Sequence, residues 1–477
     1  MTCQLPADCL NEIFEYLAED KISLRSCLLV NRSWCEVAVR IFWRNIFSIQ
    51  YYLHHREHIP FATLGTIIAC LPSESKDLLY NINGIVVPTP TLNPPIFNYL
   101  SFVKVLSICT IGQIIEDALK KQHISSSQSL YFSKYLMLQE LFKGFMSQIS
   151  SLKSLDYVSR LDTQYMPFSY FPGAKDCLKD LSAFSCDSNI YPEFCFQMSQ
   201  ICYNIQSLTI EFKNSVSDGL KDLITFQVDL KYLNLKAFED KDWREIVPAL
   251  TKHHNNLTKL HINTDIDSVP FSFIALFENL QELFICSDRY ISDFDKLQHV
   301  TFQNLRVLKI PNRQPKSEFF TKFLENNGQT LVELVLSDVN KSVKLSISRF
   351  CPNLKNLFVL FGKDETNLLK AILDSCQALE SIKMWCGHDF LNEKEFLEVI
   401  ASFSPKNFNE LKLYNDTREL FREDMESFLL SWGNRIPHKP LKLFVTTLEL
   451  NEEIITTIEK YRKLGVIRKF GFENFDY

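Results

Sequence analysis

The chain has little glycine: only 12 glycines occur among its 477 residues. Glycine-rich loops let the backbone approach nucleotide phosphates closely, but the sequence contains neither a Gly-x-Gly-x-x-Gly segment nor a Walker loop. The Gly-x-Ser-x-Gly turn of serine hydrolases is missing as well. Scarce glycine also argues against an all-β fold with many tight turns. We therefore expect no nucleotide site, no catalytic residues of these types and no cofactor.

Positive charge and long apolar runs are missing too. The formal net charge is −6, the sequence pI is about 6.0, and no run of basic residues stands out, so we expect no nucleic-acid binding. The most apolar early stretch, residues 64–71, is much shorter than the ~20 residues that a membrane span requires. Residues 1–6 lack the positive and then apolar regions of a secretion signal. We expect a protein that neither spans a membrane nor is secreted.

Cysteine is plentiful, yet the 14 cysteines are scattered and none forms a Cys-x-x-Cys pair. Such pairs are typical of zinc and redox sites. In a long chain without a secretion signal, buried and inert thiols in a reducing compartment fit better than disulfides. The sequence therefore predicts a cytoplasmic or nuclear location, or both.

One short segment matches a catalytic motif. His54-His55-Arg56-Glu57-His58 has the His-x-x-Glu-His spacing of one class of zinc proteases. On a helix, His54 and His58 would share one face and could both bind zinc. No third ligand is identifiable, and Pro60 follows closely. A solvated polar stretch is the preferred interpretation, no metal ligand is assigned, and a metal-dependent hydrolase using these two histidines is a remote alternative.

The N-terminal residues 5–48 have the pattern of three short helices. Pro6 suits a first helical turn, and the next apolar residues fall at i, i+3, i+4 and i+7 from Leu10. Ser23 is a candidate N-cap for the second helix and Asn31 for the third. So small a segment buries too little surface to be stable alone. It must be stabilised by packing against the rest of the chain, as an ordinary helical cap would be, or against a partner.

The same residues resemble an F-box. The similarity runs from Leu5-Pro6-Ala7-Asp8-Cys9-Leu10 through Leu28-Leu29-Val30-Asn31-Arg32-Ser33-Trp34 to Trp43. F-boxes dock onto a Skp-family adaptor, which links them to a cullin–RING ubiquitin ligase. The resemblance implies that the adaptor interface is formed or supported by residues at the matching positions: Leu5, Pro6, Leu10, Ile13, Leu17, Leu24, Leu28, Val30, Trp34 and Trp43.

After residue 100 a pattern of apolar residues recurs, spaced as L-x-x-L-x-L. Clear copies begin at Leu257, Leu280, Leu305, Leu331, Leu354, Leu379 and Phe408; earlier ones at Val103, Leu152, Leu178, Ile205 and Leu230; looser late ones at Leu441 and Ile467. From Leu152 to Leu379 successive starts differ by roughly 23 to 27 residues, within the range of leucine-rich repeats. The segments that precede Leu354 and Leu379 resemble those of cysteine-containing leucine-rich repeats, a type often found C-terminal to F-boxes.

These repeats predict an α/β fold. Each unit supplies a short strand and a return helix, and stacking the units buries a continuous core beneath a curved parallel sheet with helices on the convex side. Residues 49–100 are irregular, and four prolines between 86 and 95 favour an extended connector. We predict an F-box at 1–48, a helical or irregular junction at 49–100, and a leucine-rich-repeat solenoid at 101–477.

Alternation along each strand identifies the side chains that should face solvent on the concave side. Large apolar residues recur among them, and such exposed clusters commonly mark binding surfaces. The candidate substrate-binding residues are Phe284, Phe358, Leu360, Trp385 and Tyr414. Two alternatives remain open: a C-terminal element could cover these residues, or the register could be shifted by one.

The preferred hypothesis from the sequence is a substrate receptor of a Skp–cullin–F-box ubiquitin ligase, itself without catalytic residues. The F-box would hold the adaptor, and the repeats would hold a protein substrate. The alternative is a non-degradative interaction scaffold in which the F-box binds the adaptor without cullin assembly.

Overall fold

The protein is described here from a computed structural model. It describes residues 5–47, 59–83, 95–121, 127–158, 166–213, 215–237, 244–265, 271–289, 291–337, 339–387, 389–415, 422–436, 439–447 and 452–472. The chain forms two compact units: the first comprises residues 1–230 and 241–250, and the second comprises 231–240 and 251–477. The boundaries at residues 48 and 100, inferred from the sequence, divide the chain by motif and stay a prediction.

The first unit begins with three helices around a small apolar core. They are α1 (Ala7–Glu15), α2 (Lys21–Cys27) and α3 (Arg32–Arg44). Asn31 caps α3, as predicted, by accepting a hydrogen bond from the Trp34 N–H at 2.9 Å. The expected cap of α2 was wrong, because Asp20 takes that position and Ser23 donates to it at 3.0 Å. A carboxylate there also complements the positive end of the helix dipole.

The rest of the first unit contains short parallel strands and the helices between them. Its strands β1 (Val105–Ser107), β2 (Ser154–Tyr157), β3 (Ala183–Asp187) and β4 (Ser207–Glu211) pair in sequence order. Its other helices are α5 (Ile59–Ala69), α6 (Ser73–Asn83), α7 (Ile108–Lys121), α8 (Ser127–Gln148), α9 (Ala174–Leu178), α10 (Pro192–Ile201), α11 (Asp218–Thr225) and α12 (Val247–Leu250), with 3-10 turns η1 (Tyr99–Phe102), η2 (Phe168–Tyr170) and η3 (Arg244–Ile246).

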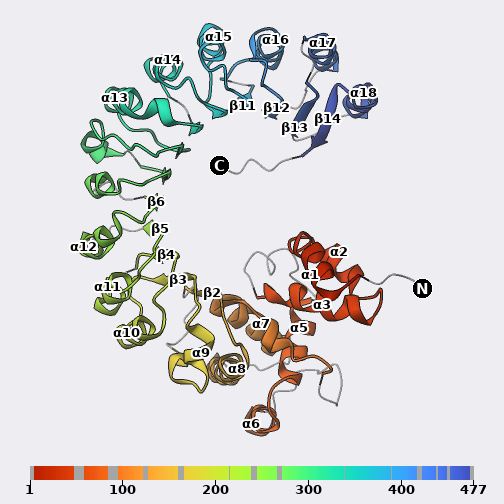
Figure 1. Cartoon of the computed structure of the whole chain (residues 1–477), viewed down its shortest axis with the longest axis vertical. Coiled ribbons are helices and arrows are strands. Elements are labelled where there is room, and N and C mark those ends of the chain that lie inside the picture. The colour runs from red at the N-terminus through yellow and green to blue at the C-terminus, as the bar shows by residue number, and fades with distance from the viewer. Residues whose placement is uncertain are drawn as a thin grey trace. The chain divides into compact units, whose positions relative to one another are not determined.

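The second unit is a regular solenoid. Its strands β5 (Tyr232–Ala237), β6 (Lys259–Thr264), β7 (Glu282–Ser287), β8 (Val307–Ile310), β9 (Glu333–Leu336), β10 (Asn356–Phe358), β11 (Ser381–Cys386), β12 (Glu410–Asn415), β13 (Leu441–Thr447) and β14 (Ile467–Gly471) are parallel and in sequence order. Within this unit the strands line the inner side of the curve and the helices the outer side (Figure 1).

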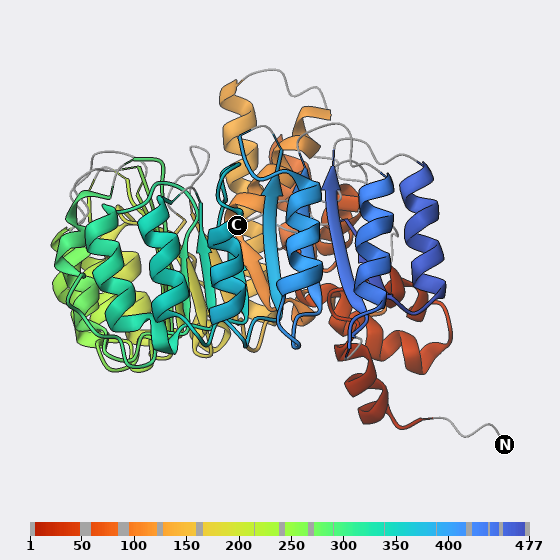
Figure 2. The ribbon, with the colours of Figure 1, turned by 90° about the horizontal axis from the view of Figure 1, so that it is seen from above.

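The outer layer of the second unit changes along the chain. Its later repeats carry the α-helices α13 (Ser317–Asn327), α14 (Lys341–Phe350), α15 (Thr366–Ser375), α16 (Glu393–Phe403), α17 (Arg422–Gly433) and α18 (Glu452–Lys463), which stand side by side in one layer, teal to blue in Figure 2. The earlier repeats return through the 3-10 turns η4 (Thr251–His253), η5 (Phe271–Leu276) and η6 (Ser292–Lys296), and η7 (Gly328–Thr330) follows α13.

The repeat leucines form the core, as expected from their spacing. In β6, for example, Leu260 and Ile262 are buried while the residues between them are partly exposed. One early copy was placed wrongly: Leu178 ends α9, and the inward residues of β3 are Phe184 and Cys186, so this copy begins three residues later, at Leu181. The last leucine of α9 has the spacing that the pattern expects of the first leucine before a strand.

A second periodic feature joins successive repeats through buried polar side chains. The Cys202 thiol donates to the Leu178 carbonyl at 3.2 Å, and the Cys376 thiol donates to the Cys351 carbonyl at 3.2 Å. At the corresponding position of another repeat, the buried Asn327 donates to the Val300 carbonyl at 2.8 Å. The Leu178 and Cys351 carbonyls also accept from the Leu181 and Leu354 N–H groups, so each thiol adds a second hydrogen bond that joins its repeat to the preceding one.

Candidate protein-interaction surfaces

The three N-terminal helices share one core, which separates the predicted adaptor residues into two kinds. The core residues are Leu10, Phe14, Leu24, Cys27, Ala38 and Ile41. Of the ten predicted residues, Leu10, Leu24 and Trp43 are buried; Leu17, Leu28 and Trp34 are half-buried; and Leu5, Pro6, Ile13 and Val30 are exposed. The exposed members can touch a partner directly, whereas the buried members hold the helices in place.

The aromatic residues of this segment have structural contacts of their own. The Trp34 ring packs edge-on against the Phe14 ring, with centroids 5.1 Å apart. Part of the Trp34 ring therefore packs on the helical core. Trp43 lies 4.5 Å from the Tyr99 ring and thereby ties α3 to the junction. An ion pair of 2.8 Å between Arg44 and Glu15 joins α3 to α1. Trp43 therefore anchors the segment to the rest of its unit.

Three exposed apolar residues of this segment were missed from the sequence. Tyr16, Ile22 and Leu29 are 90%, 81% and 84% exposed. Tyr16 directly precedes Leu17 and Leu29 directly follows Leu28, both members of the predicted set, and adjacent residues point in different directions. Together with three of the exposed predicted residues, Leu5, Ile13 and Val30, they form what we call the F-box exposed set: Leu5, Ile13, Tyr16, Ile22, Leu29 and Val30.

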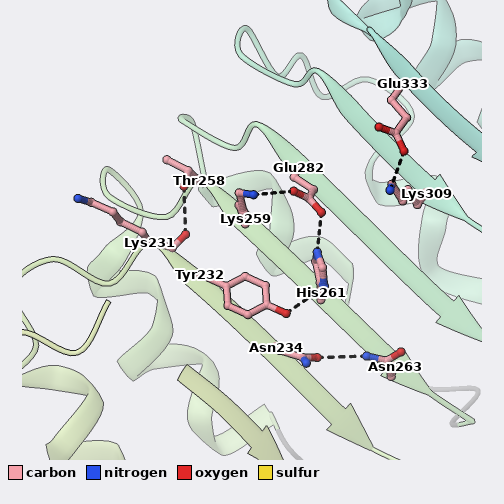
Figure 3. A network of polar contacts seen from close by, with 10 residues as sticks. All are labelled: Lys231, Tyr232, Asn234, Thr258, Lys259, His261, Asn263, Glu282, Lys309 and Glu333. Atoms are coloured by element: carbon pink, nitrogen blue, oxygen red, sulfur yellow. Dashed lines mark hydrogen bonds and ion pairs between the residues drawn. The ribbon is translucent and has the colours of Figure 1, made fainter. Parts of the chain in front are cut away.

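The solenoid offers a second surface, the inner face of its sheet, where polar side chains from β5, β6 and β7 meet (Figure 3). His261 lies between Tyr232, whose hydroxyl is 3.1 Å from Nδ1, and Glu282, whose carboxylate is 2.8 Å from Nε2. Lys259 forms an ion pair with the same carboxylate at 3.1 Å. These residues occupy neighbouring register positions on successive strands, which brings them together although they are far apart in sequence.

The electrostatics of this cluster favour a neutral histidine beside a charged glutamate. Burial lowers the pKa of His261 below its ordinary value, and the hydrogen bond to Glu282 opposes this only in part. Burial alone would raise the pKa of Glu282, but the hydrogen bonds from His261 and Lys259 outweigh it and lower that pKa. A further ion pair, between Lys309 and Glu333 at 2.6 Å, continues the pattern (Figure 3). Charges on β6 to β9 are thus matched in pairs.

The five predicted substrate-binding residues do not share one environment. Phe284, Trp385 and Tyr414 are half-buried on the inner face of the sheet, with Trp385 and Tyr414 in contact at 4.1 Å between ring centroids. The expectation that Phe358 and Leu360 face solvent was wrong, since they are only 3% and 9% exposed. The role of the half-buried residues in binding stays a prediction.

The burial of Phe358 and Leu360 has a local cause in β10. This strand is only three residues long, and after Phe358 the alternation ends: residues 359–361 are all buried. The Leu391 N–H donates to the Phe361 carbonyl at 2.8 Å, and Gly362 forms an antiparallel bridge with Phe390. Loop residues after β11 therefore pack against the residues that follow β10.

The histidines of the alternative metal site, His54 and His58, lie outside the described residues. Across the parts of the chain that the structure describes, no group of three or more His, Cys, Asp or Glu side chains could hold a metal ion. Within the same parts, none of the helices has the length and apolarity to cross a membrane.

Comparison with known proteins supports the N-terminal part of this architecture. Residues 2–49 match the family model described as F-box-like. The chain thus combines an F-box-like N-terminal segment with an α/β solenoid of leucine-rich-repeat type. Both are protein-interaction modules. None of the curated proteins matches the chain significantly.

Several solved structures are similar to parts of the chain. The leucine-rich-repeat protein LIC12759 of Leptospira interrogans is 16% identical, with a TM-score of 0.33, over 67% of this chain and 72% of that one. LegL7 of Legionella pneumophila, also a leucine-rich-repeat-containing protein, is 14% identical, with a TM-score of 0.35, over 60% and 93%. A chain of the Drosophila Toll–Spatzle complex is 12% identical, with a TM-score of 0.29, over 66% and 49%. The repeat assignment rests on the strand register within this chain, not on these similarities.

Proposed function

We propose that this protein is a substrate receptor of a Skp–cullin–F-box ubiquitin ligase. The observation that carries the proposal is the F-box-like match at residues 2–49, followed by a repeat solenoid. The F-box segment would bind the Skp-family adaptor, and the solenoid would bind a protein substrate. Holding the substrate near the ligase makes ubiquitin transfer effectively intramolecular. The chemistry of transfer would belong to the partner subunits, in the cytoplasm or the nucleus.

The F-box exposed set is the proposed contact surface for the adaptor. Leu5, Ile13 and Val30 belong both to this set and to the positions that the F-box resemblance assigns to the interface. Tyr16, Ile22 and Leu29 add further exposed apolar surface. Burial of such surface by a partner favours binding. Leu10 and Leu24 would act indirectly by maintaining the helical core.

The test is co-expression with a Skp-family adaptor, followed by purification of the complex. Ile13→Glu combined with Val30→Glu places two charges on exposed positions, so the helices should remain folded while adaptor binding is lost. The matched control is Ile436→Glu, which changes an exposed isoleucine of the second unit and should leave binding intact. Failure of the unaltered chain to bind the adaptor would overturn the proposal.

A second measurement separates the receptor from the non-degradative scaffold. The purified adaptor complex is mixed with cullin–RING ligase, ubiquitin and the activating and conjugating enzymes. Ubiquitin transfer to a protein captured by the solenoid supports the receptor. Adaptor binding without assembly of the cullin supports the scaffold.

A further inference from the structure

The inner face of the sheet changes character in the last four strands, β11 to β14. Alternation and register place one set of side chains on this face, which we call the C-terminal sheet face. Its members are Ser381, Lys383, Trp385, Glu410, Lys412, Tyr414, Lys442, Phe444, Thr446 and Lys469. The set combines lysines with aromatic rings and contains a single carboxylate, that of Glu410.

The charge of the C-terminal sheet face is strongly positive. Among its described residues are four lysines and one glutamate, an excess of three positive charges in a chain whose net charge is −6. Glu410 lies between two of the lysines, 3.1 Å from the Lys442 ammonium and 3.7 Å from that of Lys412. On β6 to β9, by contrast, two lysines face two glutamates, so the charges there balance. The positive potential is therefore local to the later strands.

Aromatic rings lie close to three of the four lysines of this face. The Lys383 ammonium lies 5.6 Å from the centroid of the Phe358 ring, and the ammonium groups of Lys412 and Lys469 lie 5.5 Å and 5.2 Å from that of Phe444. Such contacts restrict the long side chains, so less conformational entropy is lost when an anion binds. Trp385 and Tyr414 supply apolar surface beside them, with their ring centroids 4.1 Å apart.

We propose that the C-terminal sheet face binds an extended acidic segment of the protein substrate. Carboxylates of such a segment would pair with Lys383, Lys412, Lys442 and Lys469, and its apolar side chains would pack on Trp385 and Tyr414. Four strands spaced about 4.8 Å apart span about 14 Å, which an extended chain crosses with about five residues. As a statement about the substrate, this inference rests on the proposed receptor function.

The experiment measures peptide binding by the purified full chain without any adaptor. The probe is a fluorescein-labelled peptide of about 12 residues with alternating Glu and Gly, and its counterpart with Lys in place of Glu serves as the charge control. Binding is followed by fluorescence anisotropy at about 50 mM and about 300 mM NaCl, because screening between these concentrations weakens contacts between exposed charges. We expect the acidic peptide to bind, more weakly at the higher salt, and the basic peptide not to bind.

Two variants locate the binding surface. Lys383→Gln combined with Lys412→Gln removes two charges from the face and should weaken binding about tenfold, two contacts of typical strength. The matched control, Lys370→Gln with Lys394→Gln, removes the same charge from helices α15 and α16 of the same repeats, on the outer side. We expect the control to bind within about twofold of the unaltered chain.

Equal binding of the acidic and basic peptides, equal loss in both double variants, or no binding of the acidic peptide at low salt would overturn the inference. Because no adaptor is present, these outcomes leave the proposed receptor function to its own test. Circular dichroism melting curves of the two variants that coincide with that of the unaltered chain show that neither change acts through unfolding.

Discussion

Replacing Asn327 by alanine should destabilise the solenoid far more than the loss of one surface amide would. The Asn327 side chain is 1% exposed and makes three hydrogen bonds. It accepts from the Phe302 N–H at 2.7 Å and donates to the carbonyls of Val300 at 2.8 Å and Phe323 at 3.0 Å. Gln227 makes the same three kinds of contact in the first unit, with Ile205, Cys202 and Leu223. The arrangement is thus a repeated device that joins one repeat to the preceding one.

The expected loss of stability follows from the buried backbone groups that lose their hydrogen-bond partner in Asn327→Ala. The Phe302 N–H loses its buried acceptor, which costs about 1–3 kcal/mol, and each lost donor contact costs about 1 kcal/mol. We expect the free energy of unfolding to fall by about 3–5 kcal/mol, measured by urea titration and followed by circular dichroism. The control is Asn326→Ala, which removes one hydrogen bond, of 3.0 Å to the Gln298 carbonyl, from the exposed neighbour. Its effect should be no more than about 1 kcal/mol.

Asn327→Cys tests how much of this stability comes from donating a hydrogen bond to the preceding repeat. A thiol can donate to the preceding repeat, as Cys376 does to the Cys351 carbonyl, but it is a poor acceptor for the Phe302 N–H. Its loss of stability should therefore lie between those of Asn326→Ala and Asn327→Ala. Equal effects of Asn326→Ala and Asn327→Ala would refute the idea that buried polar side chains join the repeats.

Two further predictions concern ionisable groups. Burial lowers the pKa of His261, so the stability it contributes is present above the ordinary histidine pKa of about 6.5 and is lost as the pH falls below it. Between about pH 7 and about pH 5.5 the urea midpoint should therefore fall less in His261→Gln than in the unaltered chain, and equal slopes would contradict this. Burial raises the pKa of the Cys376 thiol to about 12, whereas Cys9 is exposed. Iodoacetamide at about pH 8 should label Cys9 in the native protein and Cys376 only after denaturation, as read by peptide mass spectrometry.

The sequence predicted the solenoid well because its core repeats. In β6 to β9 every inward apolar position of the pattern is buried as expected, since a strand turns alternate side chains to one face. The F-box segment was recognised from an ordered set of residues, and the helix cap at Asn31 followed from its side-chain chemistry. These features depend on residues that are near each other in sequence.

What the sequence did not predict depends on strand length and on contacts between repeats. The pattern from Leu354 to Val359 looks like that of its neighbours, yet β10 stops at Phe358, and Gly362 pairs with Phe390 of the next repeat. The exposure of Tyr16, Ile22 and Leu29 likewise follows from how three helices pack, which spacing alone does not determine. Neither the end of a strand nor the outer side of a small bundle is encoded in one local motif.

The short strand β10 also helps to explain where the solenoid could distinguish one partner from another. Before it, strands β6 to β9 present lysines that are already paired with glutamates, and a ligand would have to replace these pairs to use their charge. After it, β11 and β12 are each six residues long and in full register, and they carry Lys383 and Lys412 beside Trp385 and Tyr414. On the later strands Lys412 and Lys442 share the single carboxylate of Glu410, so an excess of positive charge beside aromatic rings is left to form ionic and apolar contacts with a ligand. Specificity for an acidic segment is therefore expected from β11 onward, and the paired strands would contribute mainly the rigid sheet that holds it.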